Sequence, residues 1–141
     1  MQYILLSPLF LLMACSSSNL TQLEPDVNLS ALVAKQWIVI SVNGKHLLND
    51  TVISFSVSEK GKVKGNAGVN NYVGQWEITK EQITSSKMAS TKKFGIEPKG
   101  IMQQEERFLR SISMITRWQV DGGELQLFDS NEVVIQLQLF Q

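Results

Sequence analysis

Short runs of alternating apolar and polar residues, separated by tight turns, constrain the fold of this chain more than any other feature. Ile53, Phe55 and Val57 alternate with serines, and a longer alternating run covers residues 133–139. A period of two places one face of a strand in a core and the other face in water. Because strands that follow one another across short turns pair antiparallel, the sequence predicts an antiparallel sheet.

The same signals predict further strands along the chain. The predicted runs are 37–42, closed by the turn dipeptide Asn43-Gly44, then 53–58, 62–64, 72–78, 83–88, 118–120, 125–127 and 133–139. Between residues 98 and 115 the apolar spacing changes to three, four and seven, which predicts one amphipathic helix with Pro98 in its first turn. The predicted apolar face of this helix consists of Ile101, Met102, Phe108, Leu109, Ile112 and Ile115.

The predicted fold class is α+β: an antiparallel, barrel-like and partly open sheet of seven to eight short strands packed on one amphipathic helix. The chain has 141 residues, 43% of them apolar, which is enough for one domain with a packed core. We expect three tryptophans in this core and three methionines filling gaps in it: Trp37, Trp76, Trp118, Met88, Met102 and Met114.

Composition argues against several functional classes. The 13 Lys and Arg residues balance 13 Asp and Glu residues, so binding of nucleic acid through bulk charge is not expected. One cysteine and one histidine exclude an internal disulfide and a multi-His or Cys-based metal site. Glu105 and Glu106 are neighbours on a helix and point about 100° apart, so they are not an opposed acid–base pair. With His46 expected in a solvated loop, we predict a non-enzymatic protein without a cofactor or metal.

The N-terminal residues are typical of a secreted lipoprotein. Residues 3–14 carry no charge and are too few to span a bilayer, which fits a signal peptide over residues 1–14. The segment Leu12-Met13-Ala14-Cys15 resembles a bacterial lipobox, in which a small residue admits the peptidase and the Cys15 thiol accepts a diacylglyceryl group. The acyl chains would then anchor the protein at about 0.8 kcal/mol per buried CH₂. The alternative is an ordinary signal peptide that ends at a chance cysteine.

The remaining chain divides into a tether and a domain. Residues 15–28 are largely polar and are predicted to be a flexible tether behind lipidated Cys15, and residues 29–141 form the domain. Ser16 resembles the outer-membrane sorting pattern of enteric bacteria. We therefore expect an outer-membrane lipoprotein that faces the periplasm.

A glycine-rich segment carries a resemblance to a known family. Its matching residues are Gly65, Ala67, Gly68, Asn70, Tyr72 and Gly74. Upstream lies the tryptophan strand 37–44, and downstream lie the segment 88–92, with Thr91, and the pair Glu105 and Phe108. Over residues 37–139 this order resembles the META domain family of HslJ-like lipoproteins. The resemblance implies links to heat shock, drug tolerance, motility or secretion.

The motif itself is expected to shape the sheet. Glycines between strands indicate positive φ values, a bulge or a close backbone crossing, and Asn70 can adopt a left-handed conformation and bond its own backbone. Many family members carry cysteines where this chain has Val69 and Gly95, which implies that these positions lie near each other and that a disulfide joins them in such members. Without that link, the loop 91–99 is expected to be looser here.

Two further features leave alternatives open. Lysines on one hairpin and beyond it form either a solvated edge that resists aggregation or a patch for anionic lipid head groups or an acidic partner: Lys60, Lys62, Lys64, Lys87, Lys92, Lys93 and Lys99. The domain, expected to be a monomer, either binds a protein of the cell envelope at an apolar groove or open strand edge, or carries a small apolar ligand or lipid in a barrel cavity lined by Phe55 and Trp76. A stress factor without a specific ligand is the third hypothesis.

Overall fold

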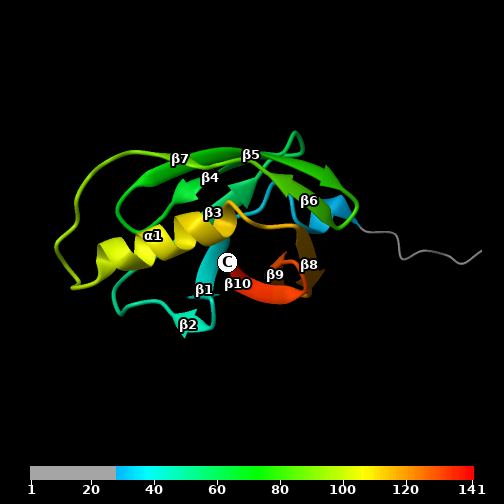
Figure 1. The fold of residues 1–141 in the computed structure, drawn as a ribbon. Coiled ribbons are helices and arrows are strands. Elements are labelled where there is room, and N and C mark those ends of the chain that lie inside the picture. The colour runs from blue at the N-terminus through cyan, green and yellow to red at the C-terminus, as the bar shows by residue number, and fades with distance from the viewer. Residues whose placement is uncertain (1–27) are drawn as a thin grey trace, which may run out of the picture.

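The computed structural model describes residues 28–141 (Figure 1). The predicted signal peptide 1–14, the lipidation site Cys15 and all but the last residue of the tether 15–28 lie outside the described residues. In the part that is described, no helix is long and apolar enough to cross a membrane.

The described chain contains one short 3₁₀ helix, η1 (Leu29–Ala31), one α helix, α1 (Ile101–Ile112), and ten strands. The strands are β1 (Trp37–Val42), β2 (Lys45–His46), β3 (Ser54–Val57), β4 (Lys62–Asn66), β5 (Asn71–Thr79), β6 (Gln82–Ser85), β7 (Ala89–Ser90), β8 (Arg117–Asp121), β9 (Glu124–Asp129) and β10 (Glu132–Leu139). Two of them, β2 and β7, have only two residues.

Eight of the strands form an antiparallel barrel. Their order is β10-β9-β8-β6-β5-β4-β3-β1, and pairing of β10 with β1 closes the ring. The narrowest seam joins β6 to β8, where Gln82 opposite Arg117 is the single paired position. β2 pairs with β1, and β7 pairs with the first half of β5 outside the ring. The predicted antiparallel, barrel-like fold class is thus confirmed, with a barrel that closes.

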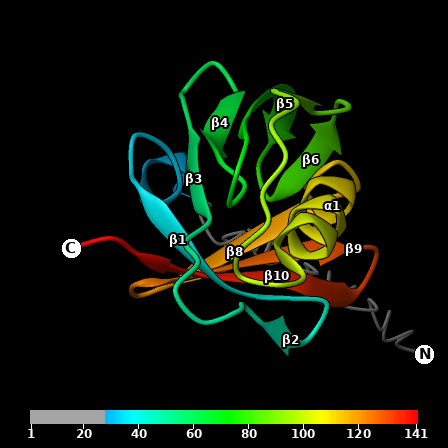
Figure 2. The ribbon, with the colours of Figure 1, turned by 90° about the vertical axis from the view of Figure 1, so that its left-hand side faces the viewer.

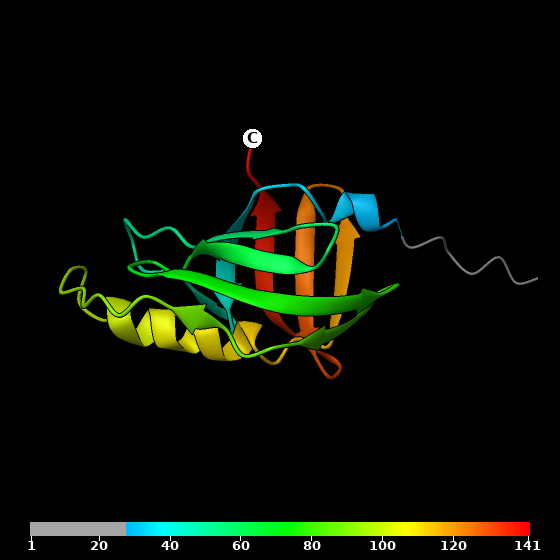
Figure 3. The same cartoon turned by 90° about the horizontal axis from the view of Figure 1, so that it is seen from above.

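The helix lies along one side of this barrel. In Figure 3, α1 is on one side, and η1 and the C-terminus are on the opposite side; Figure 2 shows the helix end-on beside β5 and β6. Phe108 of α1 is fully buried, and its ring meets that of Tyr72 on β5 edge-on at 5.2 Å between centroids. Offset and edge-on aromatic pairs add to the gain from area burial, so this contact fixes the helix on the sheet.

All three tryptophans lie in the core, as predicted. Of the methionines, Met88 is buried, whereas Met114 is 53% exposed, so the prediction of Met114 as a core residue is wrong. The prediction of a lysine-protected edge at Lys62 and Lys64 is also wrong, because β4 pairs with β3 on one side and β5 on the other. Both lysines are exposed on a central strand.

The helix is shorter than its apolar spacing predicts. It begins at Ile101 because Gly100, with φ of 92°, is in a left-handed conformation that a helix cannot contain. Pro98 therefore precedes the helix, and its carbonyl accepts a hydrogen bond from the Ile101 N–H at 3.0 Å. Ile115 lies beyond the last turn, although it is buried as expected.

The buried face of the helix also differs from the prediction. It consists of Ile101, Gln104, Glu105, Phe108, Ser111 and Ile112, whereas Met102 and Leu109 are only half-buried. The three polar members bond to loops of the barrel. Gln104 accepts a hydrogen bond from the Leu48 N–H at 2.7 Å, and Ser111 accepts one from Asn43 at 3.1 Å. Burial of these groups is tolerated because each has a partner.

Gly65 is required by a close crossing of strands, as the glycine-rich sequence predicts. A Cβ at this position would lie 2.1 Å from the backbone oxygen of Ser54 and 2.8 Å from the Tyr72 hydroxyl. The Tyr72 hydroxyl donates to that same Ser54 oxygen at 2.7 Å. The missing side chain of Gly65 therefore leaves room for a bond that joins β5 to β3 across β4.

Candidate functional site

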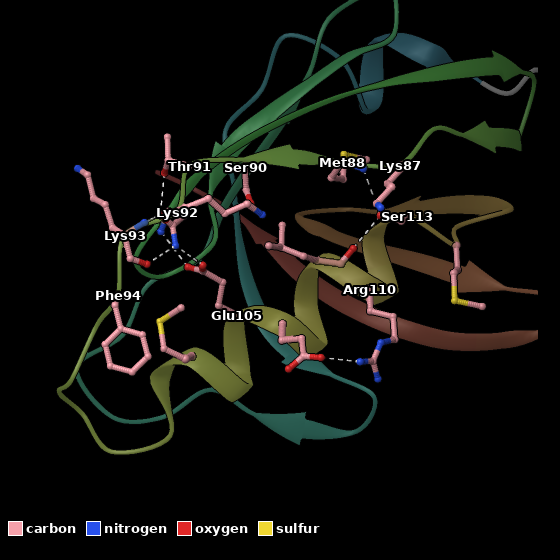
Figure 4. A pocket seen from close by; sticks show the side chains of 15 residues that line it. Lys87, Met88, Ser90, Thr91, Lys92, Lys93, Phe94, Glu105, Arg110 and Ser113 are labelled. Carbon is pink, nitrogen blue, oxygen red and sulfur yellow. Dashed lines mark hydrogen bonds and ion pairs between the residues drawn. The ribbon is translucent and has the colours of Figure 1, made fainter.

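A groove of about 830 Å³ runs between α1 on one side and β7 with the residues around it on the other (Figure 4). Its lining residues are Asn70, Lys87, Met88, Ser90, Thr91, Lys92, Lys93, Phe94, Met102, Glu105, Glu106, Leu109, Arg110, Ser113 and Met114. Figure 4 places Phe94 at one end of the groove and Lys87 and Arg110 toward the other. The groove forms only where the helix and the β7 segment come together, so the pattern of residues along the sequence does not predict it.

The groove combines apolar side chains with a positively charged rim. Met88, Met102, Leu109 and Met114 supply apolar surface, and methionine adapts readily to irregular partners. Three exposed lysines and Arg110 supply the positive charge: Lys87, Lys92 and Lys93. Arg110 pairs with Glu106 at 2.7 Å, but both side chains are about two-thirds exposed, and such pairs add little stability.

The walls of the groove are joined by the carboxylate of Glu105, which is only 3% exposed. One of its oxygens, Oε2, accepts hydrogen bonds from the backbone N–H groups of Val69 and Asn70, each at 2.8 Å. The other, Oε1, accepts one from the Asn70 side-chain amide at 2.5 Å. All three partners are donors, so Glu105 acts purely as an acceptor, the role that a carboxylate fills.

Asn70 extends this link to the opposite wall of the groove. Its amide nitrogen also donates to the Lys93 carbonyl at 3.0 Å, and its amide oxygen accepts from the Thr91 hydroxyl and the Lys93 N–H, each at 2.7 Å. Asn70 thereby makes the four side-chain hydrogen bonds that an asparagine can make. The expectation that Asn70 bonds its own backbone is therefore wrong: it joins three segments that are distant in sequence.

The other motif residues shape the sheet, as predicted. Gly68 has φ of 118°, and a Cβ there would lie 3.3 Å from Ile101 at the start of α1. Gly74 lies beneath Met88, whose sulfur would be 2.1 Å from an added Cβ. Ala67 is fully buried. Tyr72 is buried as well, and its own burial raises the pKa of its phenol. These residues bring β4, β5 and α1 together and leave no reactive group exposed.

Val69 and Gly95, the positions of the family cysteines, lie in contact. A Cβ on Gly95 would be 2.6 Å from one methyl group of Val69 and 3.6 Å from the other. The expectation that these two positions are neighbours is thus confirmed. In this chain the contact is made by packing of Val69 on the Gly95 backbone, and the Gly95 N–H donates to the Met102 sulfur at 3.2 Å.

The residues proposed to line a ligand cavity lie in the packed core. Phe55 is fully buried and Trp76 is 1% exposed, and their rings contact each other at 5.2 Å between centroids. The Trp76 indole N–H donates to the Ser85 hydroxyl at 3.1 Å. The two rings therefore fill space together, and their packing supplies no opening for a ligand at this point.

The remaining candidates for chemistry are dispersed. His46 is exposed, as expected, but it lies in the short strand β2 rather than in a loop. Glu105 is committed to the motif, while Glu106 on the next position is exposed and bonded to Arg110. Within residues 28–141, no group of three or more acidic, histidine or cysteine side chains is placed to hold a metal ion.

A closed eight-stranded barrel with one helix, held by a glycine- and asparagine-containing motif, defines the class of this domain. The family model described as META domain matches residues 30–139. The chain therefore belongs to the META domain family. A search of the curated proteins found no match.

Solved structures share the fold at low sequence identity. A protein from Burkholderia xenovorans, whose structure was determined by NMR, is 17% identical with a TM-score of 0.62, and the match covers 98% of this chain and 99% of that one. A second NMR structure is also 17% identical with a TM-score of 0.62, covering 79% of this chain and 94% of that one. A crystal structure of a DUF4847 family protein from Bacteroides vulgatus is 13% identical with a TM-score of 0.54, covering 78% and 95%.

Replacing Glu105 with glutamine is expected to lower the free energy of unfolding by about 2–3 kcal/mol, because glutamine offers one acceptor to three buried donors and hydrogen bonds to charged groups contribute more than neutral ones. The matched variant Glu106→Gln, one residue along the same helix, should change it by less than about 1 kcal/mol. Urea unfolding of the three proteins measures both. Equal losses for the two variants would contradict the assigned role of Glu105.

A double variant, Val69→Cys with Gly95→Cys, should form a disulfide under oxidising conditions, because the two positions are in contact and Gly95 does not have a positive φ. The expected gain in the free energy of unfolding is about 2–4 kcal/mol relative to the same protein after reduction. Thiol titration and unfolding with and without reductant measure the two effects. Free thiols that persist after oxidation would show that the loop does not hold Gly95 against Val69.

Proposed function

We propose that this chain is a lipid-anchored envelope protein whose META domain binds a protein partner and catalyses no reaction, in support of envelope stress tolerance or secretion. The observation that carries the proposal is the groove between β7 and α1, with its apolar surface and basic rim. It lies outside a barrel whose interior is packed, so it offers a binding surface that does not require the core to open.

The chemistry of the groove favours a peptide segment that carries both apolar and acidic side chains. Leu109 and Met114 offer apolar contacts, while Lys87 stands unpaired among the described residues at the rim. β7 pairs only with β5 among the described strands, and on its other edge the preceding Met88 N–H is bonded to the Ser113 hydroxyl at 3.4 Å. Ser90 is therefore the position at which this edge can accept main-chain bonds from an added segment. Recognition would combine main-chain bonds along β7 with apolar anchors against α1.

The anchor and the location follow from the N-terminal sequence. The lipobox-like segment ending at Cys15 supports attachment of a lipid, and Ser16 supports sorting to the outer membrane with the domain in the periplasm. A formal net charge of zero supports a protein partner rather than nucleic acid. We propose that the anchored protein is a monomer and that it holds its partner at the membrane.

Site-specific photocrosslinking in cells tests the partner. A photoreactive phenylalanine analogue at Met114, in the groove, should yield a discrete crosslinked species with an envelope protein. The same analogue at Phe140, which is 65% exposed and does not line the groove, should not. Equal crosslinking at the two positions, or none at Met114, would contradict the proposal.

The mass of the same protein, purified from membranes under native conditions, completes the test. A mass increase on Cys15 that matches a lipid supports the anchor, and an unmodified Cys15 contradicts it. A retained apolar molecule of defined mass that is lost in Trp76→Ala would support the carrier function in place of the protein-binding one.

A further inference from the structure

The loop between β7 and α1 exposes two large apolar side chains to water. Phe94 is 81% exposed and Ile96 is 77% exposed, the two highest fractions among the large exposed hydrophobic residues of the described chain. Three cations and one anion share the loop: Lys92, Lys93, Lys99 and Glu97. In Figures 1 and 3 this loop projects from the end of the molecule at which α1 begins.

The exposure of Phe94 does not come from a loose chain, because the backbone on both sides of it is held. The Lys93 N–H donates to Asn70 at 2.7 Å, and the Lys93 carbonyl accepts from Asn70 at 3.0 Å. On the other side, Gly95 packs on Val69 and Ile101, and its N–H donates to Met102. The interior thus fixes the base of the loop and leaves Phe94 and Ile96 pointing into solvent.

We infer that this loop contacts an anionic phospholipid bilayer, with Phe94 and Ile96 in the interfacial region and the lysines at the head groups. Aromatic and aliphatic side chains gain free energy on entering the boundary between head groups and acyl chains. Lysines beside them reach anionic head groups, while their alkyl stems remain against apolar surface. An exposed apolar pair framed by positive charge complements such a surface without needing a matching protein shape.

The tether is long enough to let this loop reach the bilayer that holds the lipid. This step rests on the proposed lipid on Cys15. About 13 residues separate Cys15 from Asn28, and a fully extended chain of that length spans at most about 45 Å. The described chain begins at the end of the molecule opposite the loop (Figure 1), and a domain of this size is only about 35 Å across. The tether is therefore long enough for the loop to touch the membrane that holds the lipid.

Contact through the loop would also orient the groove. Phe94 lies at one end of the groove (Figure 4), so that end would face the lipid surface. Met114, which follows the end of α1 opposite the loop, would remain accessible to a partner in solution. The inference therefore adds an orientation to the proposed function and does not compete with it for Met114.

Vesicle sedimentation of residues 28–141 tests the inference. This part contains the residues 30–139 that the META domain model matches, and a cooperative unfolding transition followed by circular dichroism establishes that it is folded before the assay. We expect binding to vesicles of phosphatidylcholine mixed with phosphatidylglycerol, weakening with salt. The double variant Phe94→Ser, Ile96→Ser should bind at least about tenfold more weakly.

Charge variants separate a local contact from general attraction. Lys92→Gln with Lys93→Gln should weaken binding by about 25-fold, since each lysine near an anionic surface contributes about fivefold. The matched pair Lys62→Gln with Lys64→Gln removes equal charge from a central strand, and Phe140→Ser removes another exposed ring, one that lies outside the loop. Both controls should bind as the unchanged domain does.

Three results would overturn the inference. The first is the absence of binding to the vesicles of phosphatidylcholine mixed with phosphatidylglycerol. The second is an equal loss in the loop variants and in their matched controls. The third is unchanged vesicle binding by the loop variants together with loss of the Met114 crosslink in cells, which would assign the loop to the protein partner and leave the groove proposal intact.

Discussion

The rest of the site depends on one interaction: the Glu105 carboxylate accepts three hydrogen bonds from the turn at Val69 and Asn70, between β4 and β5. Val69 and Asn70 supply all three donors, and Asn70 in turn holds Thr91 and Lys93. Through these two side chains, the turn between β4 and β5, the loop after β7 and the helix become one unit. The groove has a fixed width because both of its walls are tied to the same asparagine.

Burying a carboxylate between segments destabilises the folded state unless every hydrogen-bond partner of its oxygens is in place. Removing the charge from water costs several kcal/mol, and among the described residues Glu105 has no ion-pair partner to offset the cost. Backbone and amide N–H groups that point at the oxygens offset it instead. Such an arrangement stabilises one geometry over its alternatives more strictly than apolar packing alone, which tolerates small shifts.

Much of the fold could be predicted from the sequence because its signal is local. The alternation of apolar and polar residues predicts where the strands lie, and the short turns between them predict antiparallel pairing. The predicted start of the helix at Pro98 is less accurate, because Gly100 has a left-handed conformation and the helix can begin only after it, at Ile101. Its buried face was misassigned because polar residues were counted as solvated, although Gln104, Glu105 and Ser111 follow the same spacing as Phe108.

The site could be predicted only in part, for a physical reason. Close packing at Gly65 and Gly74 is a property of residue size, which the sequence displays. The roles of Asn70 and Glu105 depend on partners 21 to 36 residues away in the chain, which only the folded structure brings together. The groove likewise forms only where α1 and the β7 segment meet, and the fold brings Lys87 and Arg110 to the same rim from positions that are distant in the sequence.

Amide hydrogen exchange at Val69 and Asn70, measured by NMR on residues 28–141, tests the central role of Glu105 most directly. If these two N–H groups are held by the buried carboxylate, they should exchange only when the whole domain unfolds, with the same opening free energy as the core strands of the barrel. Exchange as fast as that of amides in exposed turns would contradict the account, because it would mean that the turn and the helix separate without unfolding of the domain.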